Sequence, residues 1–241
     1  MNKLILCEGT TDAIFLSYYL DKKVGWKYCN RPPKEIMIKE NSIEESINCY
    51  KKDDDMLLIC GVGGKDRMKS FFEHNIKNMV LHADTFQKIA VILDKDKNKI
   101  ESIEKHVAAI LSPVITVVKN NKWRRNHYTN AYKLKKEIEM LLVVIPNENQ
   151  GALETIMLDA ISENPDDKII VDEAESFVEK IRNNAARYIR NDRLELKAKL
   201  GVTWAIQYPE KTFKLMNEQI ISVPWEKSKI LNDCFSELIK I

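Results

Sequence analysis

Four short segments, far apart in this chain, place acidic or glycine residues directly after apolar runs. They are Cys7-Glu8-Gly9-Thr10-Thr11-Asp12, Gly61-Val62-Gly63-Gly64, Asp94-Lys95-Asp96 and Gly151-Ala152-Leu153-Glu154. A short apolar run that ends at a glycine or an acidic residue is typical of a buried strand. In an open α/β sheet the loops after the strands meet at one edge, so we expect these segments to lie together there.

Strands and helices are expected to alternate over residues 1–165. Thr10 or Thr11 should be the N-cap of a helix after the first strand, and Ser42 and Glu45 have the spacing of a capping box. The expected strands span residues 4–7, 35–39, 56–60, 88–93, 114–118 and 140–145, and the further helices span 42–50, 65–80 and 97–111. The charged residues 51–55 should form a solvated turn. This alternation favours an α/β fold with a mostly parallel sheet flanked by helices.

After Pro165 the sequence changes to long charged stretches of helical character. Helices are expected over residues 171–191 and 193–204 and near 225–239. We therefore expect an α/β domain over residues 1–165, with a basic insertion at about 119–137, and a helical C-terminal region over 166–241 packed on it. The chain has 241 residues, 44% of them hydrophobic, which is enough to bury such a core.

Composition narrows the class of protein. The net charge is +2, from 38 basic and 36 acidic side chains, so any contact with nucleic acid must come from local clustering. Five cysteines without a C-x-x-C pair suit a reducing compartment better than a disulfide framework. The first apolar run is too short for a signal peptide, and no stretch approaches the roughly 20 apolar residues of a membrane span. We expect a cytoplasmic protein with no membrane contact.

The acidic residues of the four segments have the chemistry of ligands for a hard cation. Mg²⁺ takes oxygen ligands and keeps several waters, so Glu8, Asp94 and Asp96 would be enough for one ion. With Asp12 and Glu154 added, the set suits two ions, an arrangement that serves phosphoryl displacement. No His and Cys set at zinc spacing competes with this interpretation.

Each segment also has an ordinary structural interpretation. Glu8 can be a carboxylate beside a helix N-terminus, Asp12 a solvated helix position and Glu154 a first-turn helix charge. Gly63 and Gly64 precede a helix and could offer backbone N–H groups to a phosphate, although the segment lacks the Lys-Ser/Thr ending of a Walker motif. The metal-site hypothesis therefore depends on all the segments taken together.

The chain resembles a Toprim domain, the Rossmann-like fold shared by topoisomerases, bacterial primases and overcoming-lysogenization-defect (OLD) nucleases. Leu4-Ile5-Leu6-Cys7-Glu8-Gly9 resembles the family's first strand and glutamate-glycine turn, and Ile89-Ala90-Val91-Ile92-Leu93-Asp94-Lys95-Asp96 resembles its D-x-D strand. The resemblance covers about residues 1–165. Asp12 and the segment 151–154 are more similar to the OLD and small standalone Toprim branch. That branch implies metal-dependent cleavage of nucleic acid, often in phage defence.

The resemblance implies a role for each matching residue. The implied ligands of Mg²⁺ or Mn²⁺ are Glu8, Asp12, Asp94, Asp96 and Glu154, with Glu8 also the general base. OLD-like nucleases use a downstream lysine to steady charge in the transition state, and Lys197 and Lys199 are equal candidates for it. Unlike the larger OLD proteins, this chain has no Walker motif and hence no ATPase domain of its own, which leaves open whether it acts alone or with a partner.

Two groups of basic residues offer a surface for nucleic acid. The first is interleaved with Trp123, Tyr128 and Tyr132, and cations beside aromatic rings are able to contact phosphates and stack bases. The alternative is a helix with a solvated basic face and its aromatic residues in the core. The second group also contains Arg182 and Arg193, and its Arg187 and Arg190 have the spacing of one helix face. This group could line the same cleft, and the alternative is that Glu179 and Asp192 neutralise it in salt bridges. The candidate residues are Lys122, Arg124, Arg125 and Lys133 in the first group and Arg187 and Arg190 in the second.

Three functional hypotheses follow. The first is a Mg²⁺- or Mn²⁺-dependent endonuclease that cleaves DNA or RNA. The second is a non-catalytic Toprim subunit that binds nucleic acid or recruits a partner, and the third is a primase-like nucleotidyl transferase. Five carboxylates favour cleavage over binding, because a binding module needs no ligands for a second metal. An ATPase or defence-system protein is a candidate partner, and a homo-oligomer is left open.

Overall fold

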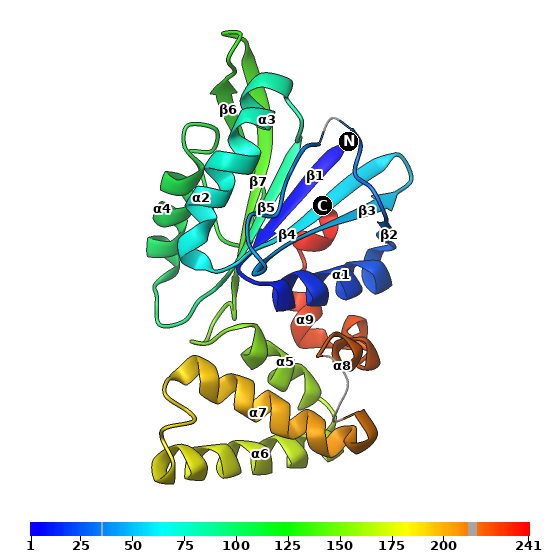
Figure 1. Ribbon diagram of the computed structural model, residues 1–241, viewed down its shortest axis with the longest axis vertical. Helices are drawn as coiled ribbons and strands as arrows, with labels where there is room; N and C mark the ends of the chain where they lie inside the picture. Colours follow the sequence, from blue (N-terminus) through cyan, green and yellow to red (C-terminus); the bar gives the residue numbers. More distant parts are fainter. Residues whose placement is uncertain (35, 212–215) are drawn as a thin grey trace.

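The computed structural model describes residues 1–34, 36–211 and 216–241. Its centre is a seven-stranded sheet with the strand order β2-β3-β4-β1-β5-β7-β6 (Figure 1). The parallel strands are β4 (Asp55–Val62), β1 (Asn2–Cys7), β5 (Lys88–Asp94) and β7 (Lys135–Ile145). The antiparallel strands are β2 (Lys27–Cys29), β3 (Glu45–Lys52) and β6 (Arg124–Thr129). The predicted α/β class with a mostly parallel sheet is confirmed.

The sequences of the parallel strands are almost continuously apolar, because helices cover both faces of the sheet and bury both sets of side chains. Ile5 and Cys7 of β1 belong to the core on one face, and Leu4 and Leu6 belong to the core on the other. The strands end in register, with Cys7 opposite both Gly61 of β4 and Ile92 of β5. The turns that follow them therefore meet at one edge of the sheet.

Two layers of helices flank the sheet (Figure 1). One face is covered by the 3₁₀ turn Lys65–Arg67, α2 (Met68–Phe71), a π turn (Phe72–Ile76), α3 (Lys77–Ala83) and α4 (Ile100–Leu111). The other face is covered by α1 (Thr10–Val24) and by the end of the chain. The expected helices at 65–80 and 97–111 lie at these places in the structure.

The C-terminal region is helical, as expected. Its helices are α6 (Pro165–Asn184), α7 (Asp192–Gln207), α8 (Met216–Ser222) and α9 (Lys229–Cys234), with 3₁₀ turns at Pro209–Lys211, Trp225–Lys227 and Leu238–Lys240. The helix α5 (Leu153–Ile161) precedes this region and follows β7. α6 and α7 form a hairpin beyond the carboxyl edge of the sheet, and α9 returns to the sheet beside α1 (Figure 1). Phe235 packs against Tyr19 with ring centroids 5.2 Å apart. The C-terminal region thus shares one apolar core with α1 and the sheet.

The helix expected over residues 42–50 is wrong, because this segment contains β3. β3 pairs with β4 through a two-residue turn at Asp53 and Asp54, and Asp53 has a φ of 51°. Aspartate tolerates this left-handed conformation, so the acidic turn closes a hairpin that a capping-box pattern does not reveal. The described residues 36–39 and 114–118 form no strand.

The basic insertion at 119–137 contains β6 and the first residues of β7, which form a long hairpin. Tyr128 is buried on the sheet face that α3 covers, while His127 and Thr129 alternate outward. The helical alternative for this segment is therefore wrong, because buried and exposed residues alternate along it with a period of two, as in a strand. No helix among the described residues is long and apolar enough to cross a membrane.

Candidate functional site

Glu8 and Asp94 bring the ends of two neighbouring parallel strands together. Glu8 directly follows β1, and its Oε1 accepts a hydrogen bond of 2.9 Å from the backbone N–H of Asp94, the last residue of β5. Both side chains are 1% exposed. Oε2 of Glu8 is buried and accepts no hydrogen bond from the described residues. The strand ends therefore hold one carboxylate oxygen in place and leave the other unsatisfied.

Asp94 is held at the start of α5. Its Oδ1 accepts a hydrogen bond of 3.0 Å from the backbone N–H of Leu153, the first residue of that helix. The partial positive charge at a helix N-terminus favours an anion there. Its Oδ2 points toward the guanidinium of Arg193, at 3.3 Å from Nη2. Asp94 thus joins the sheet edge to the helical region.

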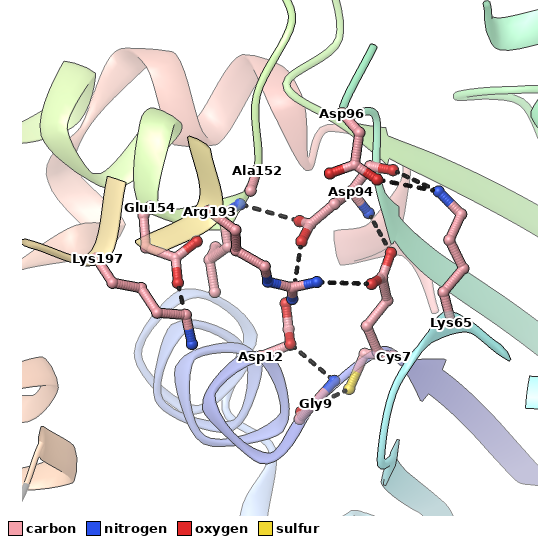
Figure 2. Close-up of polar contacts among 12 residues, drawn as sticks. Cys7, Gly9, Asp12, Lys65, Asp94, Asp96, Ala152, Glu154, Arg193 and Lys197 are labelled. Atoms are coloured by element: carbon pink, nitrogen blue, oxygen red, sulfur yellow. Dashed lines mark hydrogen bonds and ion pairs between the residues drawn. The ribbon is translucent and has the colours of Figure 1, made fainter. Parts of the chain in front are cut away.

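Arg193 is the cation at the centre of this cluster (Figure 2). It lies in the first turn of α7, and its Nη1 is 3.6 Å from Oε2 of Glu8. The preceding residue, Asp192, contacts Lys97 at 2.6 Å and Arg182 at 2.8 Å. These ion pairs hold the α7 N-terminus over the carboxyl edge of the sheet, so the guanidinium reaches both buried carboxylates.

Asp12 has a structural role in addition to its place in the cluster. Its Oδ2 accepts a hydrogen bond of 2.8 Å from the backbone N–H of Gly9, the N-cap residue of α1. This bond satisfies one backbone donor near the helix start. Asp12 is buried, which contradicts the alternative that it is a solvated helix position.

Asp96 lies beside the cluster and contacts a lysine. The strand does not continue regularly past Asp94, because Asp96 has a φ of 50°. Its backbone exchanges hydrogen bonds of 2.8 and 3.2 Å with Gly151, which ties the β5 loop to the start of α5. Its Oδ2 is 3.3 Å from Nζ of Lys65, which also donates to the carbonyl of Asp94. Asp94 and Asp96 therefore line one loop, with different cations as partners.

The glycine segment after β4 serves close backbone packing. A Cβ at Gly61 would lie 2.7 Å from the carbonyl oxygen of Gly9, so only glycine lets these two turns approach. The N–H of Gly64 donates a hydrogen bond of 2.7 Å to the carbonyl of Glu8. This amide is therefore engaged within the protein and not directed at a phosphate. Gly64 therefore ties the turn after β4 to the turn that carries Glu8, while Gly63 has a positive φ of 79° beside Glu44 and Arg67.

The two candidate lysines differ in their surroundings. Nζ of Lys197 is 3.7 Å from Oε1 of Glu154, so this lysine faces the carboxylate cluster (Figure 2). Nζ of Lys199 lies 3.0 Å from Glu195 and 3.1 Å from Glu179, and its side chain is buried between α6 and α7. Lys197 therefore faces Glu154, whereas Lys199 is paired within the helical hairpin and also lines the pocket that opens beside Arg193.

Burial makes the cluster electrostatically strained. It raises the pKa of Asp94 well above the ordinary value, and the neighbouring charges of Asp12 and Glu8 raise it further. Burial, followed by the charge of Glu8, raises the pKa of Asp12 to about 6. Burial also raises the pKa of Glu8, against the opposing hydrogen bond from Asp94 and the charges of Lys65 and Arg193. Such a group of carboxylates stabilises a cation strongly.

The donor atoms fit a single hard cation. The unsatisfied Oε2 of Glu8 and Oδ2 of Asp94 face the same point, which Arg193 contacts. Among the described residues, no three His, Cys, Asp or Glu side chains form a set that could hold a metal ion. Mg²⁺ commonly takes one or two carboxylates and keeps its waters, so two protein ligands are sufficient. Asp12, Asp96 and Glu154 lie around this pair, each with a partner of its own.

A pocket of about 570 Å³ opens beside Arg193. Asp96, Gly151 and Thr155 line it from the sheet side, and Asn191 and Leu196 line it from the helical hairpin. The buried carboxylates do not line this pocket; it adjoins the cluster through Arg193, whose guanidinium contacts Glu8 and Asp94.

The basic residues proposed for nucleic acid lie in two separate places. The tip of the β6–β7 hairpin projects at the end of the sheet opposite α6 and α7 (Figure 1). Lys133 is in this tip, whereas Asn121, next to Lys122, donates a hydrogen bond to Leu142 nearer the carboxyl edge. Arg125 contacts Glu137 at 3.6 Å. The first basic group thus follows the sheet edge and does not converge on the carboxylates.

Arg187 and Arg190 lie in the loop between α6 and α7, since α6 ends at Asn184. The expectation that they share one helix face is wrong. The helix stops because Ala185 leaves the helical conformation, with a φ of −142°, and Asn191 caps the next helix. Arg187 stacks on Tyr188, and Arg190 donates to the carbonyl of Arg187.

Sequence reasoning did not assign Arg193 or Lys65 to the site. Arg193 belonged to the second basic group, but its pairing with Asp94 depends on how α7 docks, which no local pattern reveals. Lys65 directly follows the glycine segment after a buried strand. That position at the carboxyl edge of a parallel strand was a usable signal.

Comparisons with known proteins give a family and a fold. The crystal structure of a hypothetical protein from Pyrococcus horikoshii OT3 is similar, with a TM-score of 0.51 and 16% sequence identity over 100% of this chain and 99% of that one. At this identity the likeness concerns the fold alone. No curated protein matches the sequence. The sequence matches the family described as "Protein of unknown function (DUF3226)" over residues 2–240, so the chain belongs to the DUF3226 family.

Proposed function

We propose that this protein is a metal-dependent nuclease that hydrolyses phosphodiester bonds of DNA or RNA. The observation that carries the proposal is the buried Glu8–Asp94 pair with an unsatisfied carboxylate oxygen, at the carboxyl edge of a parallel sheet. Active sites of open α/β sheets lie at this edge. The sequence resemblance to Toprim domains of the OLD type supports the same chemistry.

Glu8 and Asp94 would hold Mg²⁺ or Mn²⁺. When bound, the ion would supply Lewis acidity at a phosphoryl oxygen. Oε2 of Glu8 would be the ligand oxygen, because Oε1 already accepts a hydrogen bond from the backbone N–H of Asp94. Arg193 and Lys65 carry the positive charge that orients a phosphate over the pair.

The surrounding groups complete this proposal. Lys197 stands beside Glu154 as the lysine that offsets developing charge. The basic residues near Lys122 and the loop that carries Arg187 and Arg190 would contact the nucleic-acid backbone on either side of the pocket. We further propose that the protein acts in the cytoplasm, with an ATPase or defence-system protein as partner, and that it can act as a homo-oligomer.

A second function is supported by one specific observation. Arg193 and Lys65 already neutralise part of the carboxylate charge, and no set of three ligating side chains is present among the described residues. A subunit that binds nucleic acid without turnover would show this arrangement. The two functions differ in whether a divalent cation binds and whether phosphodiester bonds break.

The test is cleavage of supercoiled plasmid and of total RNA by the purified protein with Mg²⁺ or Mn²⁺. Glu8→Gln and Asp94→Asn should each abolish cutting, because each removes a charged ligand while it keeps the size of the side chain. Asp172→Asn is the matched control, since Asp172 is exposed and paired with Lys168. Binding of metal without any cutting would favour the non-catalytic subunit, and failure to bind metal would exclude the proposed site.

A further inference from the structure

Two cysteines outside the carboxylate cluster face each other on β2 and β3, at one lateral margin of the sheet. Cys29 is the last residue of β2, and Cys49 lies directly opposite it in β3, in antiparallel register. Both are free thiols, and their sulfur atoms are 2.7 Å apart. β2 is a three-residue edge strand that pairs with β3. The two thiols therefore lie at the margin of the sheet.

The backbone geometry of this pair suits a covalent bond. Residues directly opposite each other in an antiparallel ladder have Cα atoms about 4.5 to 5.5 Å apart. Disulfides span Cα separations of about 4.4 to 6.8 Å, so the strands need no rearrangement to accept one. By contrast, Cys7 lies in register with Gly61, and its thiol contacts the carbonyl of Cys60. Cys7 and Cys60 are also fully buried.

Access to the two thiols is unequal. Cys29 is partly exposed, whereas Cys49 is buried. Burial, together with the neighbouring Cys29 thiol, raises the pKa of Cys49 to about 12. Since the thiolate is the reactive form, Cys29 is the group that meets a reagent from solution and Cys49 is the group that resolves the product.

We propose that Cys29 and Cys49 form a reversible cross-strand disulfide on exposure to a low-molecular-weight disulfide. Cys29 sulfur attacks one sulfur of the reagent and forms a mixed disulfide, and the other half of the reagent leaves as a thiol with the Cys29 proton. Cys49 sulfur then attacks the Cys29 sulfur, and the second half of the reagent leaves with the Cys49 proton. Two protein thiols are oxidised, and one small disulfide is reduced to two thiols.

The bond would restrain a segment that reaches the carboxylate site. It closes a loop over residues 30–48, which includes Glu44. The Glu44 carboxylate contacts Arg67 at 2.9 Å, and its carbonyl accepts a hydrogen bond from Thr10 in the first turn of α1. Oxidation therefore fixes the free edge of the sheet and the segment that packs on the turn after Glu8.

The experiment starts with full-length reduced protein exposed to oxidised glutathione, followed by denaturation and titration of free thiols. The count should fall from five to three, and a peptide map should join the peptides that contain Cys29 and Cys49. Dithiothreitol should restore five thiols. Five thiols after treatment, glutathione retained on Cys29, or a bond that involves Cys7, Cys60 or Cys234 would each overturn the proposal.

Single substitutions separate the two steps. Cys49→Ser should keep one glutathione on Cys29, because the resolving sulfur is absent. Cys29→Ser should keep its four remaining thiols after the same treatment with oxidised glutathione, because the more exposed thiol is absent. The oxidised wild type should melt about 5 to 10 °C higher than the reduced form, as expected for closure of a loop of this size. If Cys29→Ser showed the same rise in melting temperature on oxidation, the assignment of the disulfide to Cys29 and Cys49 would be wrong.

Discussion

The guanidinium of Arg193 lies 3.3 Å from Oδ2 of Asp94 and joins the helical hairpin to the end of a buried strand. The same side chain is 3.6 Å from Oε2 of Glu8. A guanidinium at this point and a divalent cation bound by the same two oxygens exclude each other. Under the proposed function, Arg193 would have to move for a metal to bind there, and the phosphate of a substrate would offer it an alternative partner.

Arg193→Gln should tighten metal binding. The variant removes the competing cation from Glu8 and Asp94, so we expect the Mn²⁺ affinity measured by calorimetry to rise roughly tenfold, or about 1.4 kcal/mol. The metal-free variant should be less stable than wild type by about 1 to 3 kcal/mol at neutral pH, since the Arg193 side chain is 48% exposed and water screens part of the loss.

Arg190→Gln is the control for this prediction, because Arg190 lies in the loop before α7 and donates to the backbone carbonyl of Arg187 and not to the carboxylates. It should leave both the metal affinity and the stability unchanged. An unaltered Mn²⁺ affinity in Arg193→Gln would show that the guanidinium and the metal do not share a position.

The charge on Asp12 should make the metal-free protein less stable as the pH rises. Its pKa is raised from 3.8 to about 6 by burial and by Glu8, so the folded state binds this proton more tightly than the unfolded chain does. The resulting stability is fully present below pH 3.8 and is lost as the pH passes through about 6. The shift of about two pKa units corresponds to roughly 3 kcal/mol.

Asp12→Asn removes this charge and keeps an oxygen that can accept the hydrogen bond from Gly9. Urea unfolding in EDTA measures the free energy of unfolding at each pH. This free energy should be equal for the variant and wild type at the lowest pH, and up to about 3 kcal/mol higher for the variant at pH 7.5. Asp172→Asn, at an exposed position, should show no such difference. A constant offset between Asp12→Asn and wild type at all pH values would contradict the raised pKa.

Lys197 and Lys199 should respond differently to replacement by methionine. Lys199→Met leaves Glu195 and Glu179 without their shared lysine inside the α6–α7 hairpin, so thermal unfolding should show a loss of about 1 to 3 kcal/mol. Lys197→Met should keep the melting temperature and lower the rate of phosphodiester cleavage, because Lys197 faces Glu154. The reverse pattern would place Lys199 at the site.

The sheet and the two strand-end carboxylates could be predicted because each depends on local sequence. An apolar run followed by Glu8 or by Asp94 identifies the end of a buried strand, and the parallel topology then brings the two ends together. β3 could not be predicted in this way. Its pairing with β4 is fixed by the tight turn at Asp53 and Asp54. In the sequence, two acidic residues in such a turn look the same as two acidic residues in a solvated loop.

The contacts of Arg193 and Lys197 with the carboxylates are the part of the site that the sequence alone does not show. The positions of Arg193 and Lys197 relative to the carboxylates depend on the docking of α7, which Lys97–Asp192 and Arg182–Asp192 ion pairs help to fix. These contacts join residues that are distant along the chain. The same limitation applies to Cys29 and Cys49, because their approach follows from the register of an edge strand.

Phe235→Ala tests whether the C-terminal region and the sheet unfold together. Phe235 is fully buried and packs 6.0 Å from Phe15 and 5.2 Å from Tyr19, measured between ring centroids. Its loss should cost about 3 to 5 kcal/mol and keep a single unfolding transition, because the C-terminal region belongs to the same apolar core as α1. Phe177→Ala, at a position 53% exposed on α6, should change the stability by less than about 1 kcal/mol. Two separate transitions in urea would instead show that the helical region folds on its own.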